Sequence, residues 1–371
     1  MKRISVLALA LGTCIVPVAW GQQPASKGDP DWTEFHRTDM QRWNPYEHTL
    51  NVSNVGGLQR KWSYPTHNVV YAPAVADGVV YIGSFSSVYA LSASTGIRLW
   101  KYHISNGGLA SPPAVANGVV YVGANDGVYA LNAKTGTDIW GFDLGADVSS
   151  PPTVANGVVY IGSGDFKVYA LNANTGVKLW SYTTGLQVDS SPAVANEVVY
   201  VGSNDHNVYA LNAKTGALLW SSPTGGAVWS SPAVEDGVVY IGSDDDSVYA
   251  LDAKTGGLLW KYTTGGNVQS AAAVADGVLY IGSEDGNVYA LNAKTGTKLW
   301  SYAAGYVYSS PALANGVIYV GGGNNMYALN AKTGAKLWSY TNGHPAFCSP
   351  AVTNGVVYLG AGGNLYAFGL K

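Results

Sequence analysis

The side chains best suited to contact a ligand are aromatic and polar residues that precede a recurring proline. They lie three or five positions before that proline and differ from copy to copy, whereas the surrounding sequence is nearly constant. The aromatic members, which we expect to form one arc, are Trp229, Tyr306, Tyr308 and Phe347. Their polar partners are Asp147, Asp189, Gln269, Gln187 and Asn267. Aromatic rings beside carboxylates and amides could hold a planar ligand or a segment of a partner protein. The alternative is that these residues only fill the centre of the fold.

No residue set predicts a catalytic or metal site. The six histidines lack the H-x-x-x-H spacing of a metal-binding helix. Asp244, Asp245 and Asp246 are consecutive acids, but Asp is favoured in hairpin turns, so a metal there is the weaker alternative. No Ser-His-Asp set and no glycosidase-type carboxylate pair can be argued. We therefore expect neither catalytic residues nor metal ligands.

These positions are set by an internal repeat. A tryptophan recurs in steps of 38 or 40 residues, and each copy carries a V-[VLI]-Y element and a [VML]-Y-A-[LF] element. The tryptophans are Trp62, Trp100, Trp140, Trp180, Trp220, Trp260, Trp300 and Trp338. In the unit 189–222, the apolar pattern predicts strands at 190–194, 198–202, 208–211 and 218–221. Four short strands in about 40 residues are the size of a propeller blade.

The turns between the strands support this interpretation. Most copies join the first two strands through Asn-Gly or Asp-Gly, as at Asn117-Gly118, which is the strongest short hairpin signal. Residues 58–64 form a lone tryptophan strand, and the last unit has three strands, ending at Val352, Leu359 and Phe368. Pairing them completes an eighth blade and leaves no open sheet edge. We predict an all-β, eight-bladed β-propeller of four-stranded antiparallel blades, with a parallel β-helix as the main rival.

Composition and the first residues predict an exported protein. The formal net charge of −3 offers no basic stripe, so nucleic acid is not an expected partner. The sequence contains no run of 18 apolar residues, so it does not predict a membrane-spanning helix. Two basic residues, an apolar stretch and Ala19-Trp20-Gly21 are typical of a signal peptide, residues 1–21, cleaved after Gly21. Lipid attachment at Cys14 is the alternative, which Thr13 disfavours. Cys348 would then remain without a disulfide partner.

The repeat resembles the tryptophan-docking motif of quinoprotein, or PQQ-dependent, dehydrogenases. Ala130-x-Asn132-x-x-Thr135-Gly136-x-x-x-Trp140 and its copies are similar to that family's A-x-D-x-x-T-G-x-x-x-W, over residues 58–371. The resemblance implies that each indole packs against the next blade. It also implies a planar cofactor, PQQ, on a tryptophan at the channel mouth, where Trp229 would lie. The calcium ligands, adjacent cysteine pair and inserted loops of those enzymes have no counterpart in this sequence.

The resemblance also covers a segment that precedes the ring. Residues 31–55, with Trp32, Phe35, Arg37 and Trp43, look like the leader of such propellers. We expect the N-terminal segment 22–57 to lie against the ring without regular structure. A catalytic role for His36 or Asp39 is not favoured. The favoured function is a non-catalytic binding scaffold, monomeric and periplasmic or secreted, similar to the propeller lipoprotein of the outer-membrane barrel assembly machinery. Its expected partner is an envelope or extracellular protein, and no cofactor is expected. The alternative is a quinoprotein-like oxidoreductase that uses PQQ with Ca²⁺.

Overall fold

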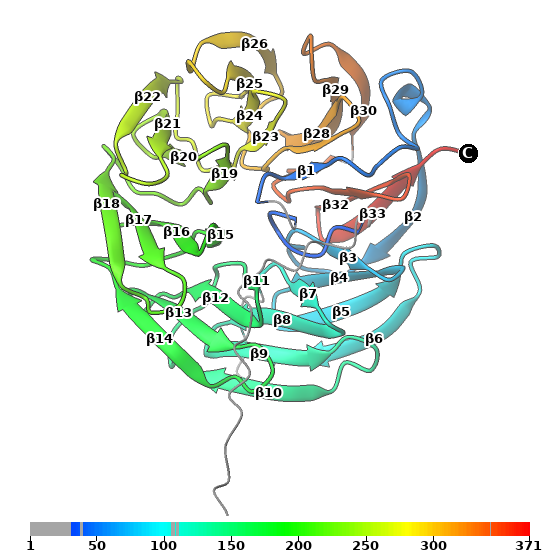
Figure 1. Ribbon diagram of the computed structural model, residues 1–371. Helices are drawn as coiled ribbons and strands as arrows, with labels where there is room; N and C mark the ends of the chain where they lie inside the picture. The colour runs from blue at the N-terminus through cyan, green and yellow to red at the C-terminus, as the bar shows by residue number, and fades with distance from the viewer. Residues whose placement is uncertain (1–30, 38–39, 105–107, 109–110, 342) are drawn as a thin grey trace, which may run out of the picture.

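The structure is a computed structural model that describes residues 31–37, 40–104, 108, 111–341 and 343–371. The predicted signal peptide, with Cys14, and Asp39 lie outside these residues. Eight sheets surround one axis, each with four strands in antiparallel order (Figure 1). The eight-bladed β-propeller predicted from the repeat is confirmed. The described residues include no helix of the length and apolarity that a membrane span requires.

Seven blades are built outward from the central axis in chain order, and the eighth ends outward with β2 from the start of the chain. The innermost strands are β3 (Ala74–Ala76), β7 (Ala114–Ala116), β11 (Thr153–Ala155), β15 (Ala193–Ala195), β19 (Ala233–Glu235), β23 (Ala273–Ala275), β27 (Ala312–Ala314) and β31 (Ala351–Thr353). The second strands are β4 (Val79–Ser84), β8 (Val119–Ala124), β12 (Val158–Gly162), β16 (Val198–Ser203), β20 (Val238–Ser243), β24 (Val278–Gly282), β28 (Val317–Gly322) and β32 (Val356–Ala361).

The outer half of each blade has the same regularity. The third strands are β5 (Ser87–Ser92), β9 (Gly127–Asn132), β13 (Lys167–Asn172), β17 (Asn207–Asn212), β21 (Ser247–Asp252), β25 (Asn287–Asn292), β29 (Asn325–Asn330) and β33 (Asn364–Gly369). The outermost strands are β6 (Arg98–His103), β10 (Asp138–Asp143), β14 (Lys178–Thr183), β18 (Leu218–Pro223), β22 (Leu258–Thr263), β26 (Lys298–Ala303), β30 (Lys336–Thr341) and β2 (Gln59–Pro65).

The hairpin turns at the inner end of each blade adopt the conformation that the sequence predicts. Asn117 and Gly118 both have positive φ, 50° and 75°, as a type I′ turn between β7 and β8 requires. The Asn196-Glu197 turn keeps this geometry without glycine, since Glu197 has a φ of 63°. The turn type is therefore imposed by the hairpin register even where the preferred residue is missing.

The core lies between neighbouring blades rather than at the axis. The second and third strands are buried along nearly their whole length, as in β4 and β5. A sheet covered on both faces buries successive side chains regardless of the direction in which they point. The outermost strands instead alternate, with the tryptophan turned inward and its neighbours exposed. This arrangement explains why the inner strand patterns are continuously apolar.

Each tryptophan joins its blade to the next one. Trp180 of β14 donates its Nε1–H to the carbonyl oxygen of Ala213 in the next blade, at 2.9 Å, and the Tyr160 hydroxyl donates to the same oxygen at 3.1 Å. Gly216 lies against the indole so closely that a Cβ there would be 2.7 Å from the ring, and its φ is +71°. The spacing of Ala, Gly and Trp in the repeat thus places each indole against the alanine carbonyl and the glycine of the next blade. The family resemblance correctly implied this contact.

All eight tryptophans make the equivalent hydrogen bond, including those that close the ring. The Nε1–H of Trp62 donates to the oxygen of Ala93, and that of Trp338 to the oxygen of Leu58. Strand β2 pairs antiparallel with β33, from Gln59 opposite Gly369 to Pro65 opposite Asn364. Figure 1 shows the blue β2 beside the red β33, so both ends of the chain build one blade. The predicted closure is confirmed.

The leader, described from Asp31, is more regular than the sequence suggests. It contains a two-residue strand, β1 (Trp43–Asn44), which pairs parallel with β27, and a 3-10 turn, η1 (Val55–Gly57). The expectation of no regular structure was therefore wrong in these two places. The cause is tertiary, because the inner edge of β27 offers unpaired backbone groups to which a short segment can bond.

The leader follows the inner edges of the blades in their order around the ring. Backbone N–H groups at the middle residue of successive innermost strands donate to it, as Val75 does to Trp32 O at 2.6 Å and Leu313 to Arg42 O at 3.0 Å. The same contact is made by Val115 to Thr33 O, Val234 to Met40 O and Val274 to Gln41 O. In Figure 1 this blue segment crosses the centre of the ring. The leader thus fills one end of the central channel.

Candidate functional site: the channel mouth

The backbone that carries the variable residues is held by a ring of buried serines. The Ser270 hydroxyl accepts the Gly282 N–H at 3.1 Å and donates to Ser309 O of the next blade at 3.3 Å. Ser309 repeats the pattern with Gly321 N–H and Cys348 O, both at 3.0 Å. Ser270 and Ser309 thus each join their own second strand to the chain entering the next blade. The mouth is therefore a rigid rim and not a set of free loops.

Cys348 occupies the serine position of the eighth blade. It is buried, and its thiol lies 3.5 Å from Ser349 O and accepts the Gly360 N–H. Burial raises the pKa of this thiol to about 12, so it stays protonated at neutral pH. Cys348 is thus a member of the structural ring rather than a reactive group at the mouth.

Replacing Cys348 with serine is expected to leave the protein folded. A hydroxyl at this position can accept the same N–H and donate to a neighbouring carbonyl, as Ser309 does. The free energy of unfolding in urea should change by less than about 1 kcal/mol. Cys348→Val is the matched contrast, because it leaves the Gly360 N–H buried without an acceptor; equal losses in both variants would contradict the proposed role of the ring.

The aromatic residues predicted to form one arc separate into two groups. Tyr308 contacts Tyr306, with ring centroids 5.0 Å apart, and Phe347 edge-on at 5.2 Å. Trp229 is not in ring contact with these three; its indole lies beside Asp244 and favours the charged form of that carboxyl. The side chains remain open to solvent, with exposed fractions of 42% for Trp229, 46% for Tyr306 and 50% for Phe347. The structure thus places an aromatic surface at the rim.

The polar residues are tied into pairs around the same rim. Asp189 accepts hydrogen bonds from Ser149 Oγ and from Asn204 Nδ2, the second at 2.9 Å. Gln269 donates to Asp244 Oδ1 at 3.0 Å. The predicted residues Gln187 and Asp147 bond to the rim through their backbone carbonyls, which accept N–H groups of the adjacent hairpins. The side chain of Asp147 is exposed. Asn267 is bonded through its amide to the hairpin that carries Asp244 and Asp246.

Two functional candidates were missed in the sequence. Asp244 contacts both Trp229 and Gln269, and its pKa is raised by burial. Glu284 accepts the Tyr306 hydroxyl at 2.9 Å. Both occupy the hairpin position that precedes a recurring aspartate, and this position varies among the copies from Asn204 to Asp244 to Glu284. That variability could have identified these two residues in the sequence. Which rim residue each of them bonds to, however, depends on how the neighbouring blade packs.

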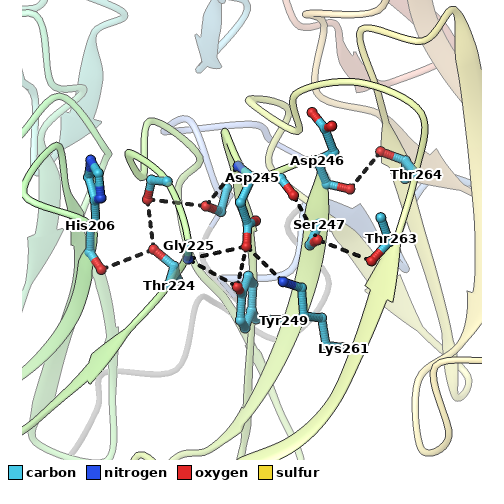
Figure 2. Close-up of polar contacts among 12 residues, drawn as sticks. His206, Thr224, Gly225, Asp245, Asp246, Ser247, Tyr249, Lys261, Thr263 and Thr264 are labelled. Carbon is cyan, nitrogen blue, oxygen red and sulfur yellow. Dashed lines mark hydrogen bonds and ion pairs between the residues drawn. The ribbon is translucent and has the colours of Figure 1, made fainter.

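The three consecutive acids are used by the fold. Asp245 accepts hydrogen bonds from the Gly225 N–H, the Tyr249 hydroxyl and, at 2.8 Å, Lys261 Nζ, as Figure 2 shows. The Asp246 carbonyl accepts the Thr264 hydroxyl. Within the described residues no group of three His, Cys, Asp or Glu side chains is placed to hold a metal ion. The Asp245 carboxylate therefore serves to join two blades.

The floor below the mouth carries buried titratable groups of the leader. Burial raises the pKa of Glu34 to about 8, opposed in part by the Val154 N–H, which donates to its carboxyl at 3.1 Å. Burial, with the charge of Arg42, lowers the pKa of His36 to about 3. Both side chains are therefore neutral near pH 7. The Arg42 guanidinium is held in the channel by hydrogen bonds to backbone carbonyls and by cation–π contacts with Trp32 and Phe35.

Because of Glu34, the folded protein is expected to become less stable as the pH rises. Its pKa is higher in the folded state, so its contribution is complete below about pH 4.5 and is lost as the pH rises toward 8. Between pH 6.5 and 8 the free energy of unfolding should fall by about 1.5 kcal/mol from this group. His36 acts in the opposite direction, but only between about pH 3 and 6.5.

Urea unfolding at pH 6.5 and 8 measures this effect, with Glu34→Gln as the comparison. The amide keeps the size of the side chain and removes the titration, so the variant should lose less stability over this interval. An identical pH slope in both proteins would rule out Glu34 as the source.

The comparisons with known proteins agree with this architecture. The sequence matches the family described as outer membrane protein assembly factor BamB over residues 84–229, 223–307 and 305–369. These segments include nearly the whole ring. The chain belongs to the BamB family. Among solved structures, BamB from Moraxella catarrhalis superposes with a TM-score of 0.70 at 20% identity, covering 84% of this chain and 100% of that one.

The BamB-family chain is also similar to quinoprotein dehydrogenases. It is 41% identical over 83 residues to the quinohemoprotein alcohol dehydrogenase ADH-IIG of Pseudomonas putida, which is 21% of this chain and 11% of that protein. It thus spans about a tenth of the length of this curated relative. A europium-containing methanol dehydrogenase superposes with a TM-score of 0.80 at 16% identity, covering 93% of this chain and 99% of that one. At this identity the superposition shows a shared fold.

The residues at the mouth do not fit PQQ. Trp229 offers an exposed ring, but the carboxylates of Asp189, Asp244 and Glu284 line the same rim and would face the three carboxylates of PQQ. Cys348 is buried in the serine ring, and no group of three potential metal ligands occurs among the described residues. The chemistry of the rim therefore favours a cationic or neutral ligand over this anionic cofactor.

Proposed function

We propose that this BamB-family chain is an exported, non-catalytic binding scaffold that holds a partner protein of the cell envelope at its channel mouth. The observation that carries the proposal is the exposed aromatic surface of Trp229, Tyr306 and Phe347 on a backbone fixed by the serine ring. Large exposed aromatic side chains on a rigid frame are typical of protein-binding hot spots. The leader fills the other end of the channel, so the rim offers a shallow surface rather than a deep cavity.

A photo-crosslinking residue placed at Trp229 or Phe347 is expected to capture a discrete partner in envelope fractions. Both side chains are exposed, so the variants should melt within a few degrees of the parent protein. Leu259 is the matched control, because it is equally exposed, at 52%, but lies on the outermost strand β22. The same products from position 259, or none from either rim position, would contradict a binding role for the mouth.

The alternative of a quinoprotein-like oxidoreductase is tested on the same purified protein. PQQ with Ca²⁺ would be added while tryptophan fluorescence and dye-linked alcohol oxidation are followed, with Trp229→Ala as the control. Saturable quenching that is lost in the variant would favour the oxidoreductase over the scaffold.

Export and assembly state complete the proposal. The basic, apolar and small-residue pattern of residues 1–21 supports export to the periplasm or beyond, with cleavage after Gly21. Mass spectrometry of the mature N-terminus would distinguish this from lipid attachment at Cys14. The closed ring, in which β2 pairs with β33, supports a monomer.

A further inference from the structure

The aromatic surface at the rim lies among carboxylates whose hydrogen-bond donors are neutral. Asp189 is bonded to Ser149 and Asn204, Asp244 to Gln269, and Glu284 to Tyr306. The carboxylates at the rim are Asp147, Asp189, Asp244, Asp246 and Glu284. The ion pairs Lys167–Asp165 and Lys261–Asp245 involve none of these five. The rim therefore carries a negative charge that is out of proportion to the formal charge of −3 of the whole chain.

Trp229 stands where the aromatic and the acidic features meet. Its indole lies beside Asp244, where its N–H favours the charged carboxylate, and the side chain stays partly open to solvent. Along the ring it lies between the blade of Asp189 and the blade of Gln269. A cation over the face of an indole is stabilised by the ring quadrupole, and a nearby carboxylate adds to the attraction. The same side chains repel an acidic partner.

The two buried arginines of the leader, Arg37 and Arg42, do not present a cation at the surface of the rim. Arg42 is fully buried, and its guanidinium donates to the carbonyl oxygens of Pro311 and Pro350, both at 2.9 Å. These acceptors directly precede the innermost strands β27 and β31. A partner would therefore meet carboxylates and aromatic rings first.

We infer that the channel mouth binds a segment of its partner that presents arginine or lysine, with the cationic group over Trp229 and within reach of Asp189 and Asp244. This inference rests on the proposed scaffold function and specifies the chemistry of its partner. Affinity comes from the ring faces and the carboxylates together, so it should fall with increasing salt. Flanking apolar side chains of the segment would cover Tyr306, Tyr308 and Phe347.

Calorimetry with a short synthetic peptide tests the inference. The probe is an unstructured peptide in which several arginines are separated by glycine and serine. The comparison peptide has citrulline at the same positions, which keeps the size and hydrogen-bonding shape of the side chain and removes its charge. The arginine peptide should bind at least about tenfold more tightly than the citrulline peptide at low salt. A glutamate version should not bind.

Variants of the full-length mature protein then locate the site. Trp229→Ala should weaken binding of the arginine peptide about tenfold, and Trp229→Phe less, since a smaller ring face remains. Asp244→Asn should also weaken it, whereas Asp276→Asn, in an exposed turn at the opposite end of an inner strand, should not. Thermal melting of each variant confirms that the ring is folded, as expected for exposed positions.

The failures of the two proposals are distinguishable. Equal binding of the arginine and citrulline peptides, no binding of either, or an unchanged affinity in Trp229→Ala would overturn the cationic partner. The scaffold proposal would survive any of these results if crosslinks from positions 229 and 347 were still specific. Loss of those crosslinks would overturn the scaffold itself, whatever the peptides show.

Discussion

Deletion of Gln59–Pro65, strand β2, is expected to abolish the folded monomer. This strand supplies the outer edge of the eighth blade, and its removal leaves the backbone groups of β33 unpaired. It also removes Trp62, whose indole bonds to Ala93 of the first blade. Burial of one tryptophan alone contributes about 3–5 kcal/mol, which is a large part of the 5–15 kcal/mol that stabilises a typical domain. Size-exclusion chromatography and circular dichroism should show unfolded protein or oligomers joined through the open edge.

The control restores the strand in another place. Gln59 lies opposite Gly369, so the seven residues can follow Lys371 behind a copy of the Asn-Ala-Lys-Thr-Gly turn, with a flexible linker at their original position. This permuted chain should recover a monomer, because the same blade forms from a continuous hairpin. A deletion variant that stays monomeric and melts at the parent temperature would refute closure by β2.

Replacement of Arg42 with alanine is expected to cause the largest loss of any single substitution in the leader. Its guanidinium is buried and donates to the carbonyl oxygens of Pro311, Pro350, Ser310 and Phe35. Hydrogen bonds to a charged donor contribute more than neutral ones, and the carbonyls would be left facing a cavity. The free energy of unfolding should fall by about 3–5 kcal/mol, measured by urea denaturation.

Two further variants separate the role of the guanidinium from that of its charge. Arg42→Lys keeps the charge but cannot reach several carbonyls at once, so it should recover only part of the stability. Arg98→Ala removes an exposed arginine of β6 and should change stability by less than about 0.5 kcal/mol. A loss in Arg42→Ala no greater than that in Arg98→Ala would show that the leader is not needed for a stable ring.

The candidate site shows where prediction from the repeat stops. Trp229, Asp189 and Gln269 were singled out because they vary where the copies otherwise agree, and they do lie on one rim. Their partners could not be read in the same way. Asp244 belongs to the hairpin of one blade and bonds to Gln269 at the entrance of the next, so the pair exists only once two blades have packed together. The single arc expected for the aromatic residues is divided, because the blade between Trp229 and Tyr308 contributes the polar Gln269 to the rim.

The sequence by itself determined the number of blades, the strands within each and the way in which the ring closes. These features repeat, and each depends on local chemistry: Asn-Gly turns, apolar strands, and a tryptophan spaced to meet the glycine of the following unit. Only the tertiary structure decided the path of the leader, the place of Cys348 in the ring of serines, and the exposure of the side chains at the rim. The leader occurs once and binds backbone groups, so no repeated sequence pattern predicts its path. Its order and the burial of Arg42 arise from inner strand edges that exist only after the eight blades have closed around it.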